Sequence, residues 1–334
     1  MTCEIQPLVD LAIQAGRLAA AICRKVQTQE TVSGVPLSKA GNEPVTVADY
    51  ASQAVILRAI SQAFPEHHVV SEEDSAHLRQ QKDDAVGRRV HELVCEVLDE
   101  TVSFDQICSW IDHQGNPDSP LRWAIDPIDG TKGFIRRQQY AVAIGLLEQG
   151  EPAAGVLVCP NLEVDAQAPE GQKGVIMAAR TGAGAVQIPL DGGETSHIHV
   201  NAATDPKHVR VLGSVESSHG DPWLLTELVS TLGFGDVVRV DSQVKYAVLA
   251  RGGAEIYLRP RSEPGWREKI WDHAAGMLVA KEAGAITTDM DGKPLDFSCG
   301  AKLERNRGVL TTHGPLHEQV VEALAQIEAV RDRS

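Results

Sequence analysis

The sequence has neither a long apolar run nor the N-terminal pattern of an exported protein. Its longest uninterrupted apolar stretches, such as residues 141–147, are far shorter than the roughly 20 apolar residues that a membrane-spanning helix needs. Glu4 and Asp10 stand where a signal peptide carries positive charge followed by unbroken apolar residues. We therefore expect a cytoplasmic protein without a membrane partner.

Paired cysteines are also absent. The six cysteines are scattered along the sequence, and no two of them form a CxxC pair. This spacing predicts neither a zinc site nor a disulfide framework, and it is typical of isolated thiols in a reducing compartment.

Positive charge is in deficit. The chain carries 46 acidic and 31 basic residues, which gives a net charge of −15. Without a basic stripe that carries aromatic side chains, such a protein is unsuited to a nucleic-acid polymer or an anionic lipid surface. The basic clusters at 136–137 and 259–269 fit a small anionic ligand better. An acidic protein can bind such an anion only where metal ions or local cations invert the field.

The first part of the chain predicts helices followed by strands. Residues 4–26 and 49–63 place apolar side chains at helical spacing. The stretch 31–46 between them is rich in Gly, Pro, Ser and Asn, which predicts a long loop, either a functional lid or a surface excursion. Residues 90–102 predict a further helix, and 112–120 a polar loop. Strands are predicted at 122–126, 140–147, 153–159 and 174–180, as an antiparallel sheet covered by the first two helices.

After about residue 205 the predicted strands and helices alternate, which is typical of an α/β unit with a largely parallel sheet. The predicted strands are 209–213, 237–240, 255–258 and 285–288, and the predicted helices are 223–232, 242–250 and 272–283. The predicted fold class is therefore α+β / α/β, a layered α-β-α-β-α sandwich with an N-terminal antiparallel sheet and a smaller α/β half. We expect one domain at 1–205 with most metal ligands, and a second at 206–334 with the substrate-binding residues and the last ligand.

The strongest single motif is the segment WAIDPIDGTKGF at residues 123–134. Its first residues predict a buried strand that Asp126 leaves at the end. Because Pro127 fixes φ and cannot donate to a β-ladder, the chain is expected to turn there.

Such a turn would collect several oxygen atoms. Asp126 and Asp129 would point into the same space, with the carbonyl of Ile128 as a third oxygen. Gly130 and Thr131 would begin a turn whose N–H groups can receive an anion. Oxygen ligands alone suit Mg²⁺ rather than zinc. The alternative is an Asx-type turn that needs no metal.

Two further acidic motifs are weaker by themselves. Residues 71–74, SEED, follow the short apolar pair Val69-Val70 and could form a solvated turn. Residues 271–276, WDHAAG, place Asp272 before an apolar helical stretch, where it could cap that helix.

In this order, the three motifs resemble the lithium-sensitive, magnesium-dependent phosphatase superfamily. That superfamily includes inositol monophosphatase, inositol polyphosphate 1-phosphatase, fructose 1,6-bisphosphatase and 3'(2'),5'-bisphosphate nucleotidase. Its pattern, D-P-[IL]-D-G-T with a later W-D-x-A-[AG]-G, is matched at 126–131 and 271–276, and the resemblance extends over nearly the whole chain. Further stretches similar to the bisphosphate nucleotidase branch are 44–50, 129–134, 214–219, 241–246 and 268–273. Ser71 and Ala48 depart from the branch, which usually has Gly at the first position and often at the second.

The resemblance implies a phosphatase that uses two or three Mg²⁺ ions per site. Glu72, Asp126 and the carbonyl of Ile128 would hold one ion, and Asp126, Asp129 and Asp272 would hold a second. Such a pair of ions can stabilise both the attacking and the leaving oxygen of an in-line displacement. Competition by lithium or sodium at the second position is a family expectation.

Thr131 and Asp49 match the pair that the family uses to orient and deprotonate a metal-bound water. A hydroxyl bonded to a carboxylate can accept a proton from water while it passes its own proton on. Asp49 could instead cap the helix that it precedes.

The substrate-binding candidates lie mostly in the second half. Ser242 follows a predicted strand and opens a helix, so that its N–H and hydroxyl could bind phosphate. Lys245, one turn on, and Arg259, at the end of another strand, could add positive charge. By resemblance, these three bind the non-scissile phosphate and the nucleotide, His219 contacts the adenosine, and Thr131 also touches the substrate. Each could alternatively be an ordinary cap or surface side chain.

The sequence therefore predicts a Mg²⁺-dependent hydrolase, a monomer or a homodimer, that converts 3'-phosphoadenosine 5'-phosphate to AMP and phosphate. By resemblance, this reaction would clear a by-product of sulfate assimilation. The alternative within the same chemistry is an inositol polyphosphate 1-phosphatase or a broad inositol and sugar phosphate phosphatase. An alternative of another class is a non-catalytic sensor of Mg²⁺ and phosphate.

Overall fold

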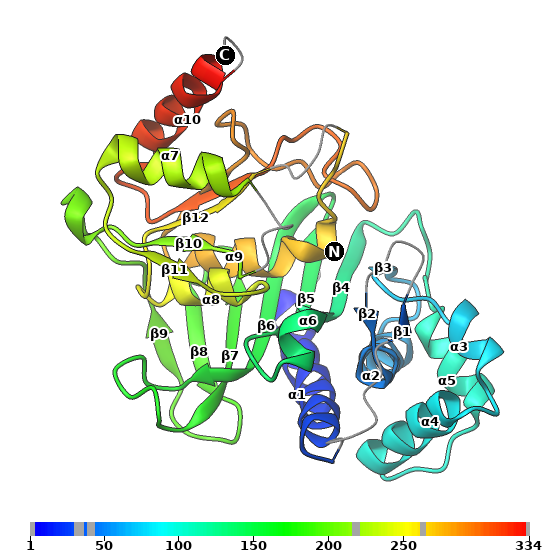
Figure 1. Cartoon of the computed structure of the whole chain (residues 1–334). Helices are drawn as coiled ribbons and strands as arrows, with labels where there is room; N and C mark the ends of the chain where they lie inside the picture. Colours follow the sequence, from blue (N-terminus) through cyan, green and yellow to red (C-terminus); the bar gives the residue numbers. More distant parts are fainter. Residues whose placement is uncertain (1–3, 30–36, 39–43, 216–220, 261–264, 332–334) are drawn as a thin grey trace.

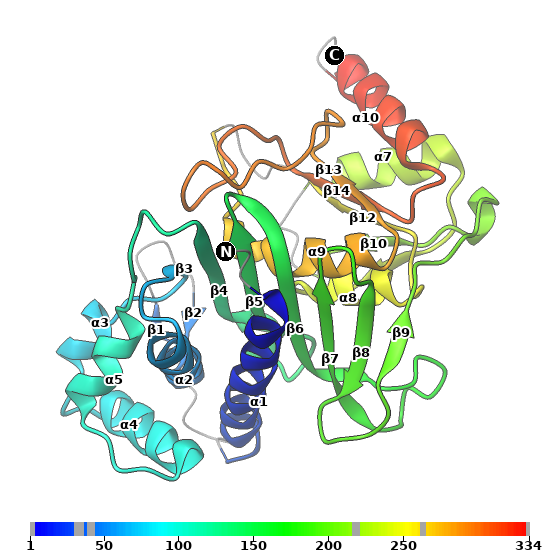
Figure 2. The same ribbon diagram turned by 180° about the vertical axis from the view of Figure 1, so that it is seen from behind.

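The computed structural model describes residues 4–29, 37–38, 44–215, 221–260 and 265–331. Two large β-sheets alternate with three layers of helices, and three hydrophobic clusters fill the spaces between the layers (Figures 1 and 2). This architecture confirms the predicted α-β-α-β-α sandwich. Every helix within the described ranges is too short or too polar to serve as a membrane span.

The large sheet contains seven strands in sequence order. Their bounds are His68–Ser71 (β3), Leu121–Asp129 (β4), Ala141–Glu148 (β5), Glu151–Glu163 (β6), Lys173–Arg180 (β7), Ala185–Pro189 (β8) and Ser196–Ile198 (β9). β4 to β9 pair antiparallel, as predicted for the four central strands, whereas β3 pairs parallel with β4. The sequence did not predict β3, β8 and β9 as strands, because these segments are too short to show a clear pattern.

Strand β4 does not end before Pro127, and the turn expected there is wrong. The strand continues to Asp129, and its register with β5 shifts between Asp126, which lies opposite Ala143, and Asp129, which lies opposite Ala141. Such a shift is a β-bulge, where the ladder is locally interrupted and a proline without an N–H is tolerated. The bulge therefore gathers the two aspartates at the end of a continuous strand.

The two predicted N-terminal helices cover one face of this sheet. Helix α1 spans Ile5–Gln29 and helix α2 spans Val47–Ala63, each within three residues of its predicted bounds. Gly16 lets α1 approach the sheet, because a Cβ there would lie 2.7 Å from the side chain of Val158. Three further helices lie near α2 (Figure 1), with the bounds Ala76–Gln80 (α3), Ala85–Leu98 (α4) and Phe104–Ile111 (α5). The helix predicted at 90–102 is α4, which begins and ends earlier.

The stretch predicted as a long loop contains a short antiparallel pair. Strand β1 spans Leu37–Ser38 and pairs with β2, Pro44–Val45. Residues 31–36 and 39–43 of this stretch lie outside the described residues, so the prediction of a lid stays a prediction.

The opposite face of the large sheet is covered by two helices from the second half of the chain. These are α8, Val244–Ala250, and α9, Ala274–Glu282. A Cβ at Gly155 of β6 would lie 2.4 Å from the carbonyl oxygen of Ala275, so the glycine is what allows α9 to lie directly on the sheet. The aspartate predicted to begin α9 lies instead in a short 3₁₀ turn, Ile270–Asp272 (η2).

The second sheet is mixed rather than largely parallel. Its order is β11-β10-β12-β14-β13, with the bounds Val211–Gly213 (β10), Val237–Arg239 (β11), Ile256–Arg259 (β12), Ile286–Thr288 (β13) and Val309–Thr312 (β14). β10 pairs parallel with β11 and β12, but β14 pairs antiparallel with both of its neighbours. The expectation failed because β14 was not predicted. Helices α7, Pro222–Leu232, and α10, His317–Arg331, lie on the outer face of this sheet. A 3₁₀ turn, Pro206–His208 (η1), precedes β10 in the chain.

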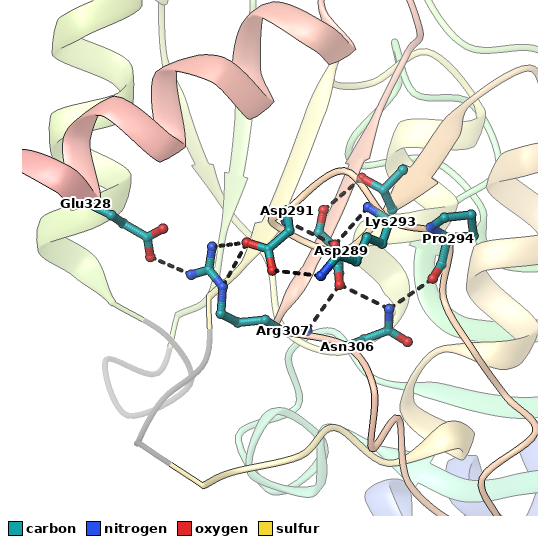
Figure 3. Close-up of polar contacts among 8 residues, drawn as sticks. Asp289, Asp291, Lys293, Pro294, Asn306, Arg307 and Glu328 are labelled. Atoms are coloured by element: carbon teal, nitrogen blue, oxygen red, sulfur yellow. Dashed lines mark hydrogen bonds and ion pairs between the residues drawn. The ribbon is translucent and has the colours of Figure 1, made fainter.

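The segment from 289 to 308 joins β13 to β14 and is anchored by a buried carboxylate. Asp289 accepts hydrogen bonds from the backbone N–H of Asp291 (3.0 Å) and Lys293 (2.9 Å) and from the Asn306 side chain (3.1 Å) (Figure 3). Arg307 joins the same network through Asp291 and reaches Glu328 on α10 at 2.6 Å (Figure 3). These contacts fix the long connection between β13 and β14.

Candidate active site

Four carboxylates converge where β3, β4 and η2 end. Asp126 and Asp129 come from the β4 bulge, and Asp272 comes from η2. Glu72 follows β3 directly, and its N–H donates to the carbonyl of Ile125 on β4 at 3.1 Å. Sequence positions up to 200 residues apart are thereby brought together, as the metal-ligand prediction required.

The electrostatics of this cluster favour a bound cation. Burial, together with the charges of Glu72, Asp129 and Asp272, raises the pKa of Asp126 well above its usual range. Burial also raises the pKa of Asp272, although Arg259 opposes the shift. Several ionised carboxylates held together out of water are stable only with a compensating cation. The donor set, four carboxylates and the carbonyl of Ile128, consists of oxygen alone and so fits a hard divalent ion such as Mg²⁺.

The Asx-type turn that served as the alternative does exist. The N–H of Ile128 donates to Oδ1 of Asp126 at 3.1 Å. This bond occupies one oxygen of one carboxylate and leaves the repulsion from Glu72, Asp129 and Asp272 in place. The turn alone therefore does not account for the cluster.

Asp49 and Thr131 are bonded to each other beside the cluster. The hydroxyl of Thr131, at the start of helix α6 (Thr131–Ile135), lies 3.4 Å from Oδ1 of Asp49 and 3.3 Å from the carbonyl of Ile128. Oδ2 of Asp49 accepts from the N–H (2.7 Å) and the hydroxyl (2.6 Å) of Thr46. Asp49 lies inside α2, where it completes a capping box, so one oxygen takes part in the cap while the other faces Thr131.

Asp272, in contrast, does not cap α9. The residue at the N-cap position is His273, whose side chain makes no capping bond. The N–H of Gly276 in the first turn is instead accepted by the Gln243 side chain at 3.1 Å. A glycine at position 276 also allows α9 to pack against α8, because a Cβ there would lie 2.3 Å from the ring of Tyr246.

Gln243 is a site residue that sequence reasoning missed. Its backbone N–H donates to Oδ2 of Asp129 at 2.7 Å, and its side chain donates to the carbonyl of Trp271 at 2.9 Å. The residue lies inside the segment 241–246 that carries the nucleotidase resemblance, but no property of a lone glutamine predicts a link between separate elements.

Ser242 lies against the metal-ligand loop in an unusual backbone conformation. Its φ is +63°, a region that few residues other than glycine adopt. A Cβ on Gly130, itself at φ +90°, would lie 2.8 Å from the Cβ of Ser242. The Ser242 hydroxyl accepts from the N–H of Val244 at 3.2 Å, but the N-cap position of α8 is Gln243 and not Ser242, because the helix begins at Val244. The structure thus brings Ser242 beside the cluster, one residue before the N-cap.

Lys245 and Arg259 line one cavity. This cavity is small and is bounded by Ser214, Lys245, Tyr257, Leu258 and Arg259. Lys245 is 4% exposed, its Nζ donates to the carbonyl of Val240 at 3.1 Å, and it lies 5.4 Å from the centre of the Tyr257 ring. Burial lowers the pKa of Lys245 to about 8, with Arg259 acting in the same direction and Asp129 against it.

Arg259 is held by two carboxylates. Its Nε pairs with Oε2 of Glu268 at 2.8 Å, and its Nη2 pairs with Oδ2 of Asp272 at 3.3 Å. Donor atoms of Glu268, Asp272 and His273 lie within 4.8 Å of one another, but Arg259 already pairs with two of these residues. We therefore identify the Arg259 guanidinium as the positive charge that lies among Glu268, Asp272 and His273. His219, the predicted adenosine contact, lies outside the described residues.

Comparison with known proteins places the chain in a family. A sequence model of the inositol monophosphatase family matches residues 2–329. The chain belongs to the inositol monophosphatase family. The family is generally metal-dependent, which supports a divalent metal ion at the carboxylate cluster.

Relatives and solved structures define its place in the family. A protein from Schizosaccharomyces pombe named 3'(2'),5'-bisphosphate nucleotidase is 37% identical and aligns with 95% of this chain and 94% of its own length. A rice protein of the same name is 39% identical over 97% and 94% of the two chains. An inositol monophosphatase structure from an Anabaena species covers 96% of both chains with a TM-score of 0.64 and 23% identity. One from Thermotoga maritima covers 97% and 99%, with a TM-score of 0.64 and 19% identity. The structural likeness confirms the inositol monophosphatase fold.

Proposed function

We propose that this chain is a Mg²⁺-dependent phosphatase that converts 3'-phosphoadenosine 5'-phosphate to AMP and inorganic phosphate. The observation that carries the proposal is that an acidic cluster adjoins two cations, the buried Lys245 and the half-buried Arg259. Arg259 is bonded to Asp272 at 3.3 Å, and Asp129 is bonded to the N–H of Gln243, two residues before Lys245. A substrate with two phosphates needs both kinds of group, one for hydrolysis and one for binding. The relatives from S. pombe and rice, both named 3'(2'),5'-bisphosphate nucleotidase, support this choice of substrate.

The carboxylates supply the metal sites. Glu72, Asp126 and the Ile128 carbonyl would hold one ion, and Asp126, Asp129 and Asp272 would hold a second. When bound, Mg²⁺ offsets the negative charge of the phosphate oxygens and makes a nearby water more acidic. Binding of the ions also relieves the mutual repulsion of the carboxylates, which is the physical reason that the cluster is tolerated.

Thr131 and Asp49 would handle the proton of the attacking water. As the water oxygen forms a bond to the 3'-phosphorus, the Thr131 hydroxyl accepts the released proton and passes its own to Asp49. The bond between phosphorus and the ribose 3'-oxygen breaks, and this oxygen takes up a proton from solvent. The bonds from Thr46 to the second oxygen of Asp49 keep the carboxylate in place.

Residues of the second half would bind the remainder of the substrate. Lys245 and Arg259 provide positive charge for the 5'-phosphate at the cavity that they line. Ser242 would contribute at the edge of the same site, and His219 would contact the adenosine. An acidic protein thereby recognises an anion through two local sources of positive charge.

The proposal is tested by phosphate release from 3'-phosphoadenosine 5'-phosphate in Mg²⁺ and in excess chelator. We expect turnover only with Mg²⁺, and a loss of kcat by at least about 100-fold in Asp49→Asn. Ser103→Ala is the matched control, because it weakens the capping box of α5 by about 1 kcal/mol and Ser103 bonds Gln106 rather than either reacting side chain. Equal turnover in Asp49→Asn and wild type, or turnover that persists in chelator, would refute the mechanism.

A further inference from the structure

Glu268 is a buried carboxylate whose oxygens are held by three neighbouring side chains. It is 4% exposed. Its Oε2 pairs with Nε of Arg259 at 2.8 Å and lies 3.4 Å from Nε2 of His273. Its Oε1 accepts from the indole N–H of Trp266 at 3.1 Å. A carboxylate with this many donors is fixed in orientation, and so are the groups bonded to it.

The backbone of Glu268 is fixed as well. Its carbonyl accepts from the N–H of Leu303 at 2.9 Å, and the next residue, Lys269, forms a β-bridge with Lys302. Leu303 belongs to the segment from 289 to 308 that Asp289 anchors (Figure 3). These backbone contacts between two segments of the fold therefore fix the position of the Glu268 carboxylate.

The contact with Glu268 decides which part of Arg259 faces the cavity. A guanidinium is planar, with its donors in a fixed fork. Because Glu268 engages the Nε edge, the Nη groups remain for other partners, and one of them already reaches Asp272. Arg259 also lines the cavity with Lys245 and Ser214. Without the Glu268 carboxylate, the guanidinium would keep only the longer bond to Asp272, at 3.3 Å, to orient it.

We propose that Glu268 is a positioning residue that holds the Arg259 guanidinium at the cavity and thereby sets the preference for substrates with a second phosphate. The inference rests on the proposed function, because it takes Arg259 as a ligand of the non-scissile phosphate. Glu268 itself touches no substrate, so its contribution acts through Arg259. The effect therefore falls on bisphosphates and not on monophosphates.

An Arg–Glu pair with a fully buried carboxylate, beside the same strand, provides a matched control. Glu255 is fully buried and pairs with Nη2 of Arg210 at 2.7 Å, with a further bond to the N–H of Arg210. Like Arg259 and Glu268, this pair includes a residue near or within β12, but neither member lines the cavity. Glu255→Gln thus reports the cost of disrupting a buried Arg–Glu pair without disturbing the site.

The test compares kcat/KM for 3'-phosphoadenosine 5'-phosphate and for adenosine 3'-monophosphate in wild type, Glu268→Gln and Glu255→Gln. We expect the preference of the wild type for the bisphosphate to fall by roughly tenfold or more in Glu268→Gln, the effect of one charge-assisted contact. The loss should appear mainly in KM, with kcat for the monophosphate close to that of wild type. Glu255→Gln should retain the wild-type preference.

Each outcome decides between the possibilities. If wild type prefers the bisphosphate and Glu268→Gln keeps the full preference, or loses activity equally on both substrates, Glu268 is only structural and the inference fails while the proposed function stands. If wild type itself shows no preference, the proposed function and the inference fail together. Should Glu268→Gln not fold, Glu268→Asp replaces it, since it keeps the charge but withdraws it from Arg259; an unchanged preference there overturns the inference.

Discussion

The backbone N–H of Gln243 donates a hydrogen bond of 2.7 Å to the carboxylate of Asp129. The two residues belong to separate elements, because Asp129 is the last residue of β4 and Gln243 directly precedes α8. The Gln243 side chain then joins the carbonyl of Trp271 and the N–H of Gly276. One buried glutamine thus couples the β4 bulge to the turn that carries Asp272.

Replacing Gln243 with Met should weaken divalent-metal binding as well as stability. The substitution keeps the side-chain volume but leaves a buried carbonyl and a helix N–H unpaired, which costs about 1–3 kcal/mol. Because these groups hold Asp272 relative to Asp129, we expect the calorimetric Kd for Mg²⁺ to rise by roughly tenfold. Gln187→Met is the control, because the Gln187 side chain, on β8 of the large sheet, donates to the carbonyl of Val164. An unchanged Kd in Gln243→Met would contradict this coupling.

Asp126→Asn should stabilise the protein in excess chelator. Burial and the neighbouring carboxylates raise the pKa of Asp126 in the folded state above that of the unfolded chain. The folded protein therefore binds the proton more tightly, and stability falls as pH rises from about 4 through the raised pKa. The variant lacks this loss, so its free energy of unfolding at neutral pH should exceed that of wild type. Urea unfolding at several pH values measures the difference.

The stability of wild type should respond to Mg²⁺ far more than the stability of Asp126→Asn. At a Mg²⁺ concentration of about 100 times Kd, wild type should gain ~2.7 kcal/mol of stability, whereas Asp126→Asn should gain little. A variant that is less stable than wild type in chelator, with the same dependence on pH, would show that the carboxylates do not repel each other as described.

Binding of the bisphosphate should weaken as Lys245 loses its proton. Burial lowers the pKa of the Lys245 ammonium to about 8, so the positive charge is complete below this value and lost above it. We expect KM for 3'-phosphoadenosine 5'-phosphate to rise between about pH 7 and 9.5, while Lys245→Arg, which stays charged, shows a flatter profile. Identical profiles for the two proteins would separate Lys245 from the substrate phosphate.

Gly130→Ala should destabilise the site for two separable reasons. Gly130 has φ +90°, and an added Cβ would lie 2.8 Å from the Cβ of Ser242. Gly182 also has positive φ, +76°, but an added Cβ would meet nothing within 4 Å. Gly182→Ala therefore costs only the backbone strain, about 1 kcal/mol, and Gly130→Ala should cost roughly 1–3 kcal/mol more. Equal melting temperatures of the two variants would mean that Ser242 does not limit the space at Gly130.

The order of layers and the pair Asp126 and Asp129 could be predicted from sequence because their signals are local, whereas Glu72 and Asp272 were predicted only through the family resemblance of the three motifs. Helix α2 shows apolar spacing over 17 residues, and the motif at 123–134 carries its acidic residues within a few positions of Pro127. The bulge at Pro127 was mistaken for a turn because a missing N–H is compatible with both, and only the pairing with β5 distinguishes them.

Long-range contacts explain the remaining errors. β14 has only four residues, Val309–Thr312, too few to show a periodic pattern. Its antiparallel direction depends on the connection from 289 to 308, whose path no periodicity predicts. Gln243 and Glu268 act through bonds to partners in other elements, so a single sequence contains no sign of their positions. The roles assigned to the site residues remain predictions that the kinetic experiments test.

The central claim is most directly tested by comparing kcat/KM for 3'-phosphoadenosine 5'-phosphate with that for inositol 1,4-bisphosphate, both measured as phosphate release in the same Mg²⁺ buffer. We predict a value at least about tenfold higher for the nucleotide, a difference in transition-state stabilisation of ~1.4 kcal/mol. An equal or higher value for the inositol compound would contradict the assignment of Ser242, Lys245 and Arg259 to a nucleotide bisphosphate.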